Sequence, residues 1–220
     1  YARNAGRVSL SGRPDRSWNP EISGAVQAVG VSEANSAFYA GGHFTTAHGN
    51  QRAWYAAKFS TQPGAAVDTD FDFVPSSATA GKYQQTIATA GNRVYIGGSE
   101  HNLFGYDAAT NQRVSGAMTF SMGGDLQATT VSSKGVIYGS CHCSDAAYQD
   151  MYVWSMNGSW SRVDEIKWVG AWNAATGESL KWTPFELSSQ RKTGAWALET
   201  DNYGNLWVGG DFTLSHTDAT

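Results

Sequence analysis

The chain has 220 residues, of which 41% are apolar and 15% are charged, and its formal net charge is −4. This composition supports a folded core and excludes a disordered chain. The longest basic run is Arg191-Lys192, which argues against nucleic-acid binding through phosphate neutralisation. No stretch approaches the roughly 20 apolar residues of a membrane span.

The residue types point to many short strands joined by turns. The chain has 25 glycines, and 13% of its residues are aromatic. Glycine permits tight turns, and aromatic side chains suit half-buried strands. The modest charge is typical of a secreted or particle-surface protein. No signal peptide is visible, and since the first residue is Tyr1 we expect a longer polypeptide.

From the N-terminus onward, a predicted strand that ends in two small residues recurs four times. Another predicted strand precedes each copy, and turn residues rich in Gly and Asn separate the two, as in β-hairpins. Gln85, Gln127 and Ala197 lie twelve positions before the first small residue of their copies, and Gln27 lies fourteen before. The small residues are Gly41-Gly42, Gly97-Gly98, Gly139-Ser140 and Gly209-Gly210.

A third and a fourth predicted strand follow in each unit. The third covers residues 54–59, 103–107 and 168–173, and the fourth ends near a Trp-x-Pro or similar motif. Four strands per unit, repeated radially, predict an all-β fold of the β-propeller type with four-stranded blades. The fourth-strand motifs are at 18–20, 73–75 and 182–184, with a degenerate candidate at 119–121.

We expect residues 1–220 to form one domain of about four blades, or to be part of a larger ring that residues outside this sequence continue. The third blade is longer than the roughly 40–50 residues of a propeller blade, which predicts an inserted hairpin at 144–163. Residues 1–23 are predicted to complete the last blade, so that strands from both termini close the ring and hide its edges. The remaining boundaries are 24–80, 81–122, 123–187 and 188–220.

Several motifs together resemble a known class of repeat. They are Asp211-Phe212 after the last glycine pair, the Trp-x-Pro closers, the Gly-Gly-Asp-Leu-Gln run at 123–127, and Cys141-His142-Cys143. On these residues the chain resembles the propeller-type repeats of secreted actinobacterial surface proteins, which also appear in tail proteins of their phages. The resemblance covers nearly the whole chain. It implies extracellular display, often beside carbohydrate-binding or adhesive domains, and it carries over no catalytic motif.

No residue set predicts catalysis, a metal site or a cofactor. Asp68, Asp70 and Asp72 alternate like the start of a calcium loop, but the glycine and glutamate of such a loop are missing, and three aspartates on a solvated strand face are the alternative. Cys141 and Cys143 are too few for zinc. They are either two buried thiols or a local disulfide.

The histidines His43 and His142 follow the small pairs of their units, in loops expected on one rim of the ring. Since Ser99 and Asp211 take this place in the other units, the repeat does not preserve a ligand type. We therefore interpret these histidines as loop residues and not as a metal ring.

Two groups of residues are candidates for ligand binding. Gln27, Gln85 and Gln127 share one register in three first strands, where their amides either form a polar collar for a neutral polar ligand or satisfy backbone groups and channel water. The inserted hairpin carries aromatic residues that either bind sugars or proteins, or cover their own blade. The hairpin candidates are Tyr152, Trp154 and Trp160.

We expect a non-catalytic propeller module for adhesion or assembly, extracellular or on a virion tail, as in a secreted adhesin or a phage minor tail protein. Its partners would be cell-surface polysaccharide or neighbouring structural proteins. The alternative is a lectin-like, carbohydrate-binding propeller. A glycan-degrading enzyme with a site at the channel mouth is a third hypothesis, which no motif supports.

Overall fold

The computed structural model describes residues 3–49, 51–75, 82–119, 124–152, 158–184 and 194–211. Every element of regular secondary structure assigned within these ranges is a β-strand, which confirms the all-β prediction. In the same residues, no helix is long and apolar enough to cross a membrane.

The first unit is an antiparallel sheet of three strands, with a small ladder beside it. The order in the sheet is β1-β2-β5, and β3 pairs with β4. The residues after β5 rejoin the sheet at a single bridge between Phe59 and Val67. The strands are β1 (Ala25–Ser32), β2 (Ala37–His43), β3 (Thr46–Ala47), β4 (Gln51–Arg52) and β5 (Ala56–Ser60).

The second and third units share one sheet, and the fourth contributes a hairpin. The order in the shared sheet is β10-β11-β9-β8-β7-β6, with β12 paired to β11. The second unit is β6 (Gln84–Ala90), β7 (Arg93–Gly98), β8 (Asn102–Asp107) and β9 (Arg113–Thr119). The others are β10 (Leu126–Val131), β11 (Val136–Gln149), β12 (Arg162–Asn173), β13 (Ala195–Thr200) and β14 (Leu206–Gly210).

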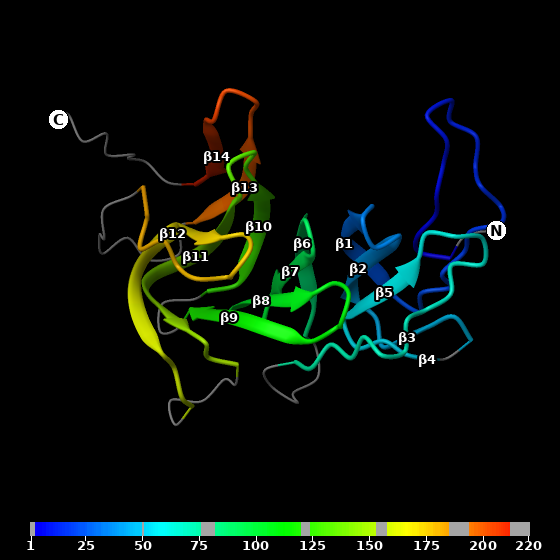
Figure 1. Ribbon diagram of the computed structural model, residues 1–220, viewed down its shortest axis with the longest axis horizontal. Coiled ribbons are helices and arrows are strands. Elements are labelled where there is room, and N and C mark those ends of the chain that lie inside the picture. The colour runs from blue at the N-terminus through cyan, green and yellow to red at the C-terminus, as the bar shows by residue number, and fades with distance from the viewer. Residues whose placement is uncertain are drawn as a thin grey trace.

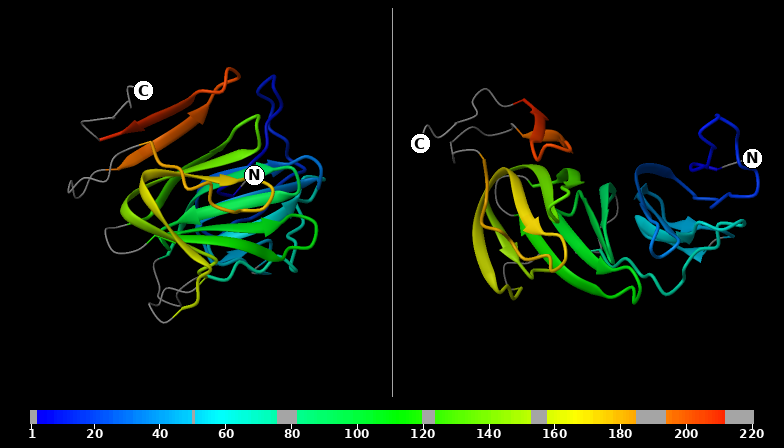
Figure 2. Two further views of the ribbon diagram at one scale, coloured as in Figure 1. Left: turned by 60° about the vertical axis from the view of Figure 1, so that its left-hand side comes forward. Right: turned by 45° about the horizontal axis from the view of Figure 1, so that its top comes forward.

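The four units follow one another along an arc (Figures 1 and 2). Their first strands contact one another in chain order, β1 with β6, β6 with β10, and β10 with β13. Between β6 and β10 the side chains meet directly, since the Thr86 and Thr129 hydroxyl oxygens are 2.6 Å apart. The shared sheet therefore curls until its two end strands touch.

The curled sheet encloses a core to which both of its units contribute. Strands of period two place alternate side chains on this inner face. The core residues are Ala88, Tyr95, Leu103, Ala117, Leu126, Ile137, Cys141, Cys143, Ala147, Ile166, Trp172 and Ala174.

The inserted hairpin joins two units. It was expected at 144–163, and the structure forms it by extending β11 and β12. The extension of β11 also pairs with β9 of the preceding unit, with Ala147 opposite Thr119 and Gln149 opposite Ala117. The insertion is thus a structural link between the second and third units.

The small residues end the second strands for a steric reason. In each first strand the register shifts at one residue, a β-bulge, and the small pair lies opposite. A Cβ on Gly98 would lie 2.3 Å from the Tyr83 carbonyl oxygen, so only glycine fits there. In the third unit Ser140 and Cys141 occupy these positions. The predicted pair, Gly139-Ser140, was out of register by one residue.

The N-terminal segment differs from its prediction. Residues 3–23 pack against the first unit, where Trp18 Nε1 donates to the Ser60 carbonyl oxygen at 2.9 Å and its ring meets Phe38 edge-on at 4.9 Å. β13 and β14 lie at the other end of the arc (Figure 1), and among the described residues they pair with each other only. In the described part of the chain, residues 3–23 therefore do not pair with the last unit, as the prediction required.

Candidate functional site

The bulge places one residue of every unit in the same position. These residues are Gln27, Gln85, Gln127 and Trp196. The predicted register of three glutamines is therefore real, and the fourth member is a tryptophan that is 41% exposed. Sequence spacing had aligned Ala197 instead.

Two of the three glutamines contact each other. Gln85 Nε2 donates to Gln127 Oε1 at 2.6 Å and to the Leu126 carbonyl oxygen at 2.9 Å. Both side chains are half-buried, whereas Gln27 is exposed on β1. The amides thus link the second and third units, and Gln27 is free of that contact.

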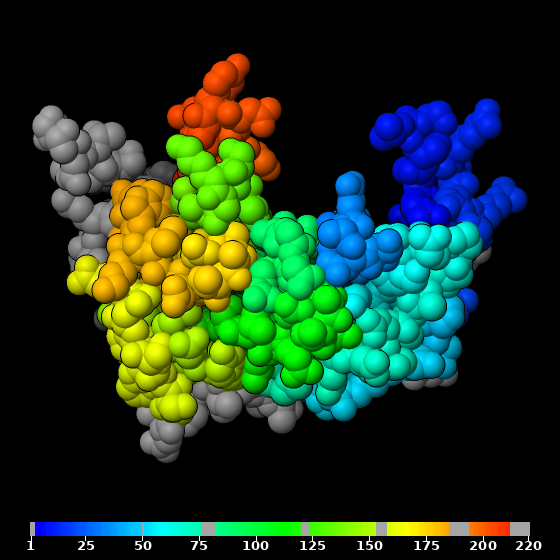
Figure 3. Space-filling model, viewed as in Figure 1, coloured from blue at the N-terminus to red at the C-terminus, as the bar shows by residue number. Residues whose placement is uncertain are grey.

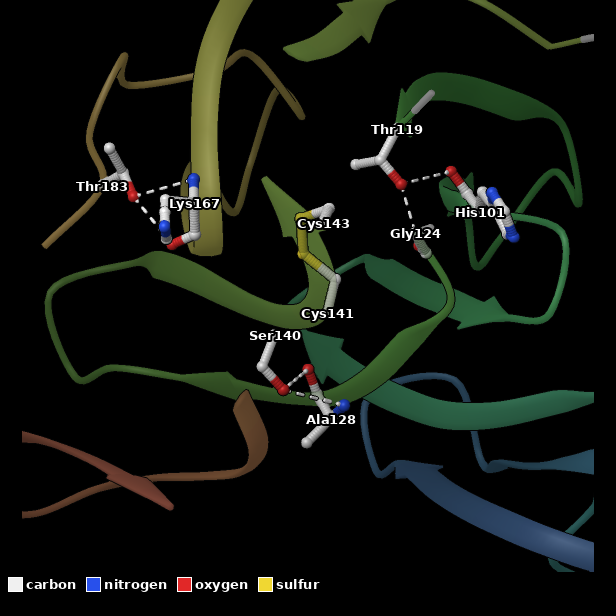
Figure 4. The surroundings of a disulfide bond; sticks show 9 residues. All are labelled: His101, Thr119, Gly124, Ala128, Ser140, Cys141, Cys143, Lys167 and Thr183. Atoms are coloured by element: carbon white, nitrogen blue, oxygen red, sulfur yellow. Dashed lines mark hydrogen bonds between the residues drawn. A yellow bond between two sulfur atoms is a disulfide. The ribbon is translucent and has the colours of Figure 1, made fainter. Parts of the chain in front are cut away.

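A hydroxyl group supports the third bulge from the opposite strand. Ser140 Oγ accepts from the Ala128 amide at 3.1 Å and donates to the Ala128 carbonyl oxygen at 3.4 Å (Figure 4). Ser99 Oγ contacts the amide and carbonyl of Tyr83 in the same way in the second unit. These bonds satisfy backbone groups that a bulge leaves outside the ladder.

Around the bulges, six side chains form a continuous series that we call the aromatic rim. His43 stacks on Tyr83 with ring centroids 4.7 Å apart, and the Tyr83 hydroxyl donates to Asp125 Oδ2 at 3.2 Å. Asp125 Oδ1 lies 2.8 Å from His101 Nε2. The rim comprises His43, Tyr83, His101, Asp125, His142 and Trp196.

The rim continues through His142 to the fourth unit. The His142 ring lies 6.5 Å from His101 and 5.9 Å from Trp196, both edge-on. His142 belongs to a wide bulge in β11, where the three residues 141–143 face the single residue Trp168 of β12. The aromatic rim therefore reaches every unit of the arc.

Cys141 and Cys143 flank His142 and form a disulfide. Figure 4 shows this bond, and both cysteines are fully buried in the core of the curled sheet, whereas His142 between them is half-buried. The bond closes the bulge at its base.

The carboxylate of Asp125 is the charged centre of the rim. Burial alone would raise its pKa, but the hydrogen bond and charge of His101, with His142 and Tyr83 nearby, hold the pKa of Asp125 below its usual value. The group is therefore an ionised acceptor at neutral pH. Behind it, Gln84 Nε2 donates to Glu100 Oε1 at 3.1 Å, and both residues are fully buried.

The hairpin candidates that the structure describes, Tyr152 and Trp160, contact residues outside the aromatic rim. Tyr152 stacks on the Arg113 guanidinium at 4.5 Å and lies against Gly116, so it is part of the packing. Trp160 is 39% exposed and meets Tyr148 edge-on at 5.2 Å. Trp154 lies outside the described residues.

The aspartates of the calcium-like segment do not converge. Asp68 pairs with Lys58 at 2.9 Å, and Asp72 pairs with Arg52 at 3.2 Å. Asp70 uses its backbone amide to bond Asp68 Oδ1. Within the part of the chain that the structure describes, no three His, Cys, Asp or Glu residues are placed to hold a metal ion.

Sequence reasoning missed Tyr83, Asp125, His101 and Trp196 as members of one site. Two register positions carry the signal: the residue after each small pair, which includes His43 and His142, and the residue directly before the first strand, which includes Tyr83 and Asp125. These positions meet only because neighbouring units pack side by side. A comparison within one repeat therefore does not reveal them.

Comparisons with known proteins identify no family. No family model and no curated protein matches the chain. Among solved structures it is similar to the extracellular domain of a putative one-component system from B. thetaiotaomicron (12% identity, 84% of this chain and 20% of that one, TM-score 0.48). It is also similar to the computationally designed Ika4 protein (12%, 86% and 94%, 0.45) and to U3-55K (10%, 77% and 54%, 0.45). The chain thus spans a fifth of the first of these proteins.

Proposed function

We propose that the four units are blades of a β-propeller arc and that the chain is a non-catalytic binding module, displayed outside the cell or on a virion tail. Repeated antiparallel units whose first strands pack side by side are typical of a propeller, and the second unit has the four strands of a full blade, β6 to β9. The function is argued from the aromatic rim, because a fold of this kind hosts many activities.

The ligand class that the rim fits is a neutral, polar molecule such as a saccharide of a cell-surface polysaccharide. One observation carries this proposal: aromatic rings and one carboxylate form an unbroken series of contacts from His43 to Trp196 across all four units. Rings offer apolar faces, and the imidazoles, the Tyr83 hydroxyl and the Asp125 carboxylate offer donors and acceptors. An extended chain of hydroxyl-bearing rings would meet both kinds of group.

Charge in the rim favours a neutral ligand over an ionic one. Asp125 is already engaged by His101 and by the Tyr83 hydroxyl. A phosphate or another strong anion would face this carboxylate. A ligand hydroxyl, by contrast, donates to a carboxylate without a charge penalty.

The test is retention of the protein on purified bacterial cell-wall polysaccharides, measured together with any sugar released. We expect retention, no released sugar, and at least tenfold weaker binding in His43→Ala and in Trp196→Ala. Trp160→Ala is the matched control, because it removes a similarly exposed tryptophan from the hairpin.

The outcomes separate the candidate functions. Loss of retention in Trp160→Ala alone would place the binding site on the hairpin and contradict the proposed site at the aromatic rim. Released sugar would make the protein a glycan-degrading enzyme. No retention on any polysaccharide would contradict the saccharide proposal and favour a role in adhesion to, or assembly with, other proteins.

A further inference from the structure

A lysine, an aspartate and an asparagine meet where the first unit packs against the second. Lys58 Nζ donates to Asn111 Oδ1 at 2.8 Å and lies 2.9 Å from Asp68 Oδ2. Asn111 Nδ2 donates to the same aspartate oxygen at 3.1 Å. Each of the three side chains therefore contacts the other two. In the space-filling view, the cyan surface of the first unit lies directly against the green surface of the second (Figure 3).

Ordered backbone holds the three residues in place. Lys58 lies in β5, opposite Tyr39 of β2, and its carbonyl oxygen accepts from the Asp68 amide at 2.8 Å. Asn111 belongs to the turn between β8 and β9, with a φ of 62°, and its amide donates to the Asp107 carbonyl oxygen at 2.9 Å. The turn of the second unit thereby presents the Asn111 side chain to the first unit.

The equivalent place between the second and third units holds only small residues. Gly105 has the register of Lys58, since each pairs with the tyrosine in the middle of its second strand. Gly177 occupies the place of Asn111 in the matching turn, and its amide donates to the Asn173 carbonyl oxygen at 2.8 Å. A Cβ on Gly105 or on Gly177 would lie 2.2 Å or 2.1 Å from Ser115 Oγ. The same positions therefore converge at both interfaces.

The fold itself requires neither the lysine nor the asparagine. Glycine serves at both positions of the next interface, and glycine adopts the positive φ of Asn111 without strain. At the first interface the two reactive groups occur together, and the remaining contact of Lys58 Nζ is the Ala108 carbonyl oxygen at 3.0 Å. The pair thus calls for an explanation in terms of its own chemistry.

Asp68 provides a proton acceptor for the lysine. Burial raises the pKa of Asp68, but the hydrogen bonds from Lys58 and Asn111 and the charge of Lys58 lower it, and the pKa lies below its usual value. The carboxylate is therefore ionised at neutral pH. The side chains of Lys58 and Asp68 are 11% and 29% exposed, so little water competes for their contacts.

We propose that Lys58 and Asn111 join in an intramolecular amide bond, which cross-links the first and second units. Asp68 takes one proton from the Lys58 ammonium, and the neutral amine attacks Cγ of Asn111. A bond forms between Nζ and Cγ, the bond between Cγ and Nδ2 breaks, and Asp68 relays a proton from Nζ to the leaving nitrogen. The products are the amide and one ammonium ion, so atoms and charges balance without an oxidant or a cofactor.

The arrangement supplies what this reaction needs. Well-oriented groups within one molecule react as though present at about 10⁵–10⁸ M, because the entropy of bringing them together is already lost. Ammonia diffuses away after it leaves, so the linked form accumulates. Lys58 and Asn111 are 53 residues apart, and the bond would therefore close a long loop and restrict the unfolded chain. This link is independent of any ligand at the aromatic rim.

The experiment is mass spectrometry of the intact, reduced and denatured protein. We expect a mass lower than that of the sequence by one ammonia. Digestion with trypsin should leave the bond after Lys58 uncut and give one branched peptide that contains both Lys58 and Asn111. In a denaturing gel the linked chain should migrate faster than an unlinked one, because the closed loop makes it more compact.

Three variants test the three roles. Lys58→Arg and Asn111→Ala each remove one partner of the bond, so both proteins should have the full mass of their sequences. Asp68→Asn keeps both reacting groups, and we expect at least tenfold less linked protein after the same time. Asn92→Ala is the matched control, because Asn92 also donates to an aspartate, Asp107, at 2.9 Å, but the charged partner there is an arginine. The loss of ammonia should persist in this variant.

The mass of the natural chain decides the proposal whether or not a variant folds. The full sequence mass would overturn it and leave the three side chains as a hydrogen-bonded contact between units. A loss of ammonia that persists in Lys58→Arg would also overturn it, because an asparagine can lose ammonia by cyclising onto its own backbone. Equal amounts of linked protein in Asp68→Asn would contradict the part proposed for Asp68.

Discussion

At the scale of single residues, the side chain at the bulge position differs between units: in one unit it contacts the next unit, and in another it is exposed to solvent. Gln85 donates two hydrogen bonds to the third unit, whereas Gln27 has the same backbone position and is exposed. Gln85→Ala should lower the free energy of unfolding by about 1–2 kcal/mol, because it leaves the Leu126 carbonyl and the Gln127 amide without that partner. Urea denaturation measures the loss.

Gln27→Ala is the control, and a change within about 0.5 kcal/mol is expected for an exposed residue. A double-mutant cycle of Gln85→Ala with Gln127→Ala isolates the pair itself. Additive effects of the two substitutions would show that the amides contribute separately, and would contradict the direct contact.

Asp125 predicts a dependence of stability on pH. Its pKa is lowered in the folded protein, against the effect of burial, by His101 and Tyr83. A carboxylate with a depressed folded pKa stabilises above its unfolded pKa of about 3.9, and that stability is lost as the pH falls through the folded value. The free energy of unfolding should therefore fall less steeply below about pH 4 in Asp125→Asn than in the natural chain.

Urea midpoints measured at several pH values from about 5 downward test this difference. Other aspartates with lowered pKa, such as Asp68, act equally in both proteins. Equal slopes for the two proteins would mean that the contact with His101 does not stabilise the folded state.

At the scale of elements, the wide bulge in β11 joins core packing to the rim. Its two cysteines are buried in the core, and the histidine between them contacts rings of the second and fourth units. Replacing both cysteines by alanine should lower the free energy of unfolding, because a cross-link restricts the unfolded chain. We expect a loss of about 1–3 kcal/mol, at the low end for disulfides, because the loop that this bond closes is very short. Denaturation of the oxidised protein, the reduced protein and the double variant should rank the oxidised protein highest.

The glycine pairs predict how tightly neighbouring units approach. Gly97→Ala should destabilise by about 1–3 kcal/mol, because its Cβ would overlap Leu126 of the following unit. Gly209→Ala has the same register, and among the described residues its Cβ would meet only Ala197, at 3.6 Å, so its effect should be near zero or slightly stabilising. Thermal denaturation of the two variants compares them directly. Equal losses would place the cost in the strand itself and not in the interface.

At the scale of the whole molecule, local patterns predicted more than long-range contacts did. The recurring small pairs and the turn residues before them located the paired strands, because a hairpin is a local structure. It misplaced the third small pair by one residue, since a bulge hides its register in the sequence.

Features that depend on contact between units were harder to predict from the sequence. The link from β11 to β9 and the meeting of Tyr83 with Asp125 join residues of different repeats. Ring closure by the two termini followed from counting strands, but closure depends on how far each unit rotates from its neighbour. Four units along the arc leave the ends apart (Figure 1).

Stacked units also predict an uneven distribution of stability. Each first strand contacts only its neighbours, so the chain resembles a linear array in which an end unit has one interface and an inner unit has two. Amide hydrogens of β6, β7, β10 and β11 should therefore exchange slowly, close to the rate of global unfolding. Amides of β13 and β14, which among the described residues pack on the third unit alone, should exchange at least tenfold faster.

Hydrogen exchange followed by mass spectrometry tests this gradient. Uniform exchange in all four units would mean that the arc unfolds as a single cooperative unit. In that case the sheet shared by the second and third units would transmit its stability through β10 to the last hairpin, and the array description would be wrong.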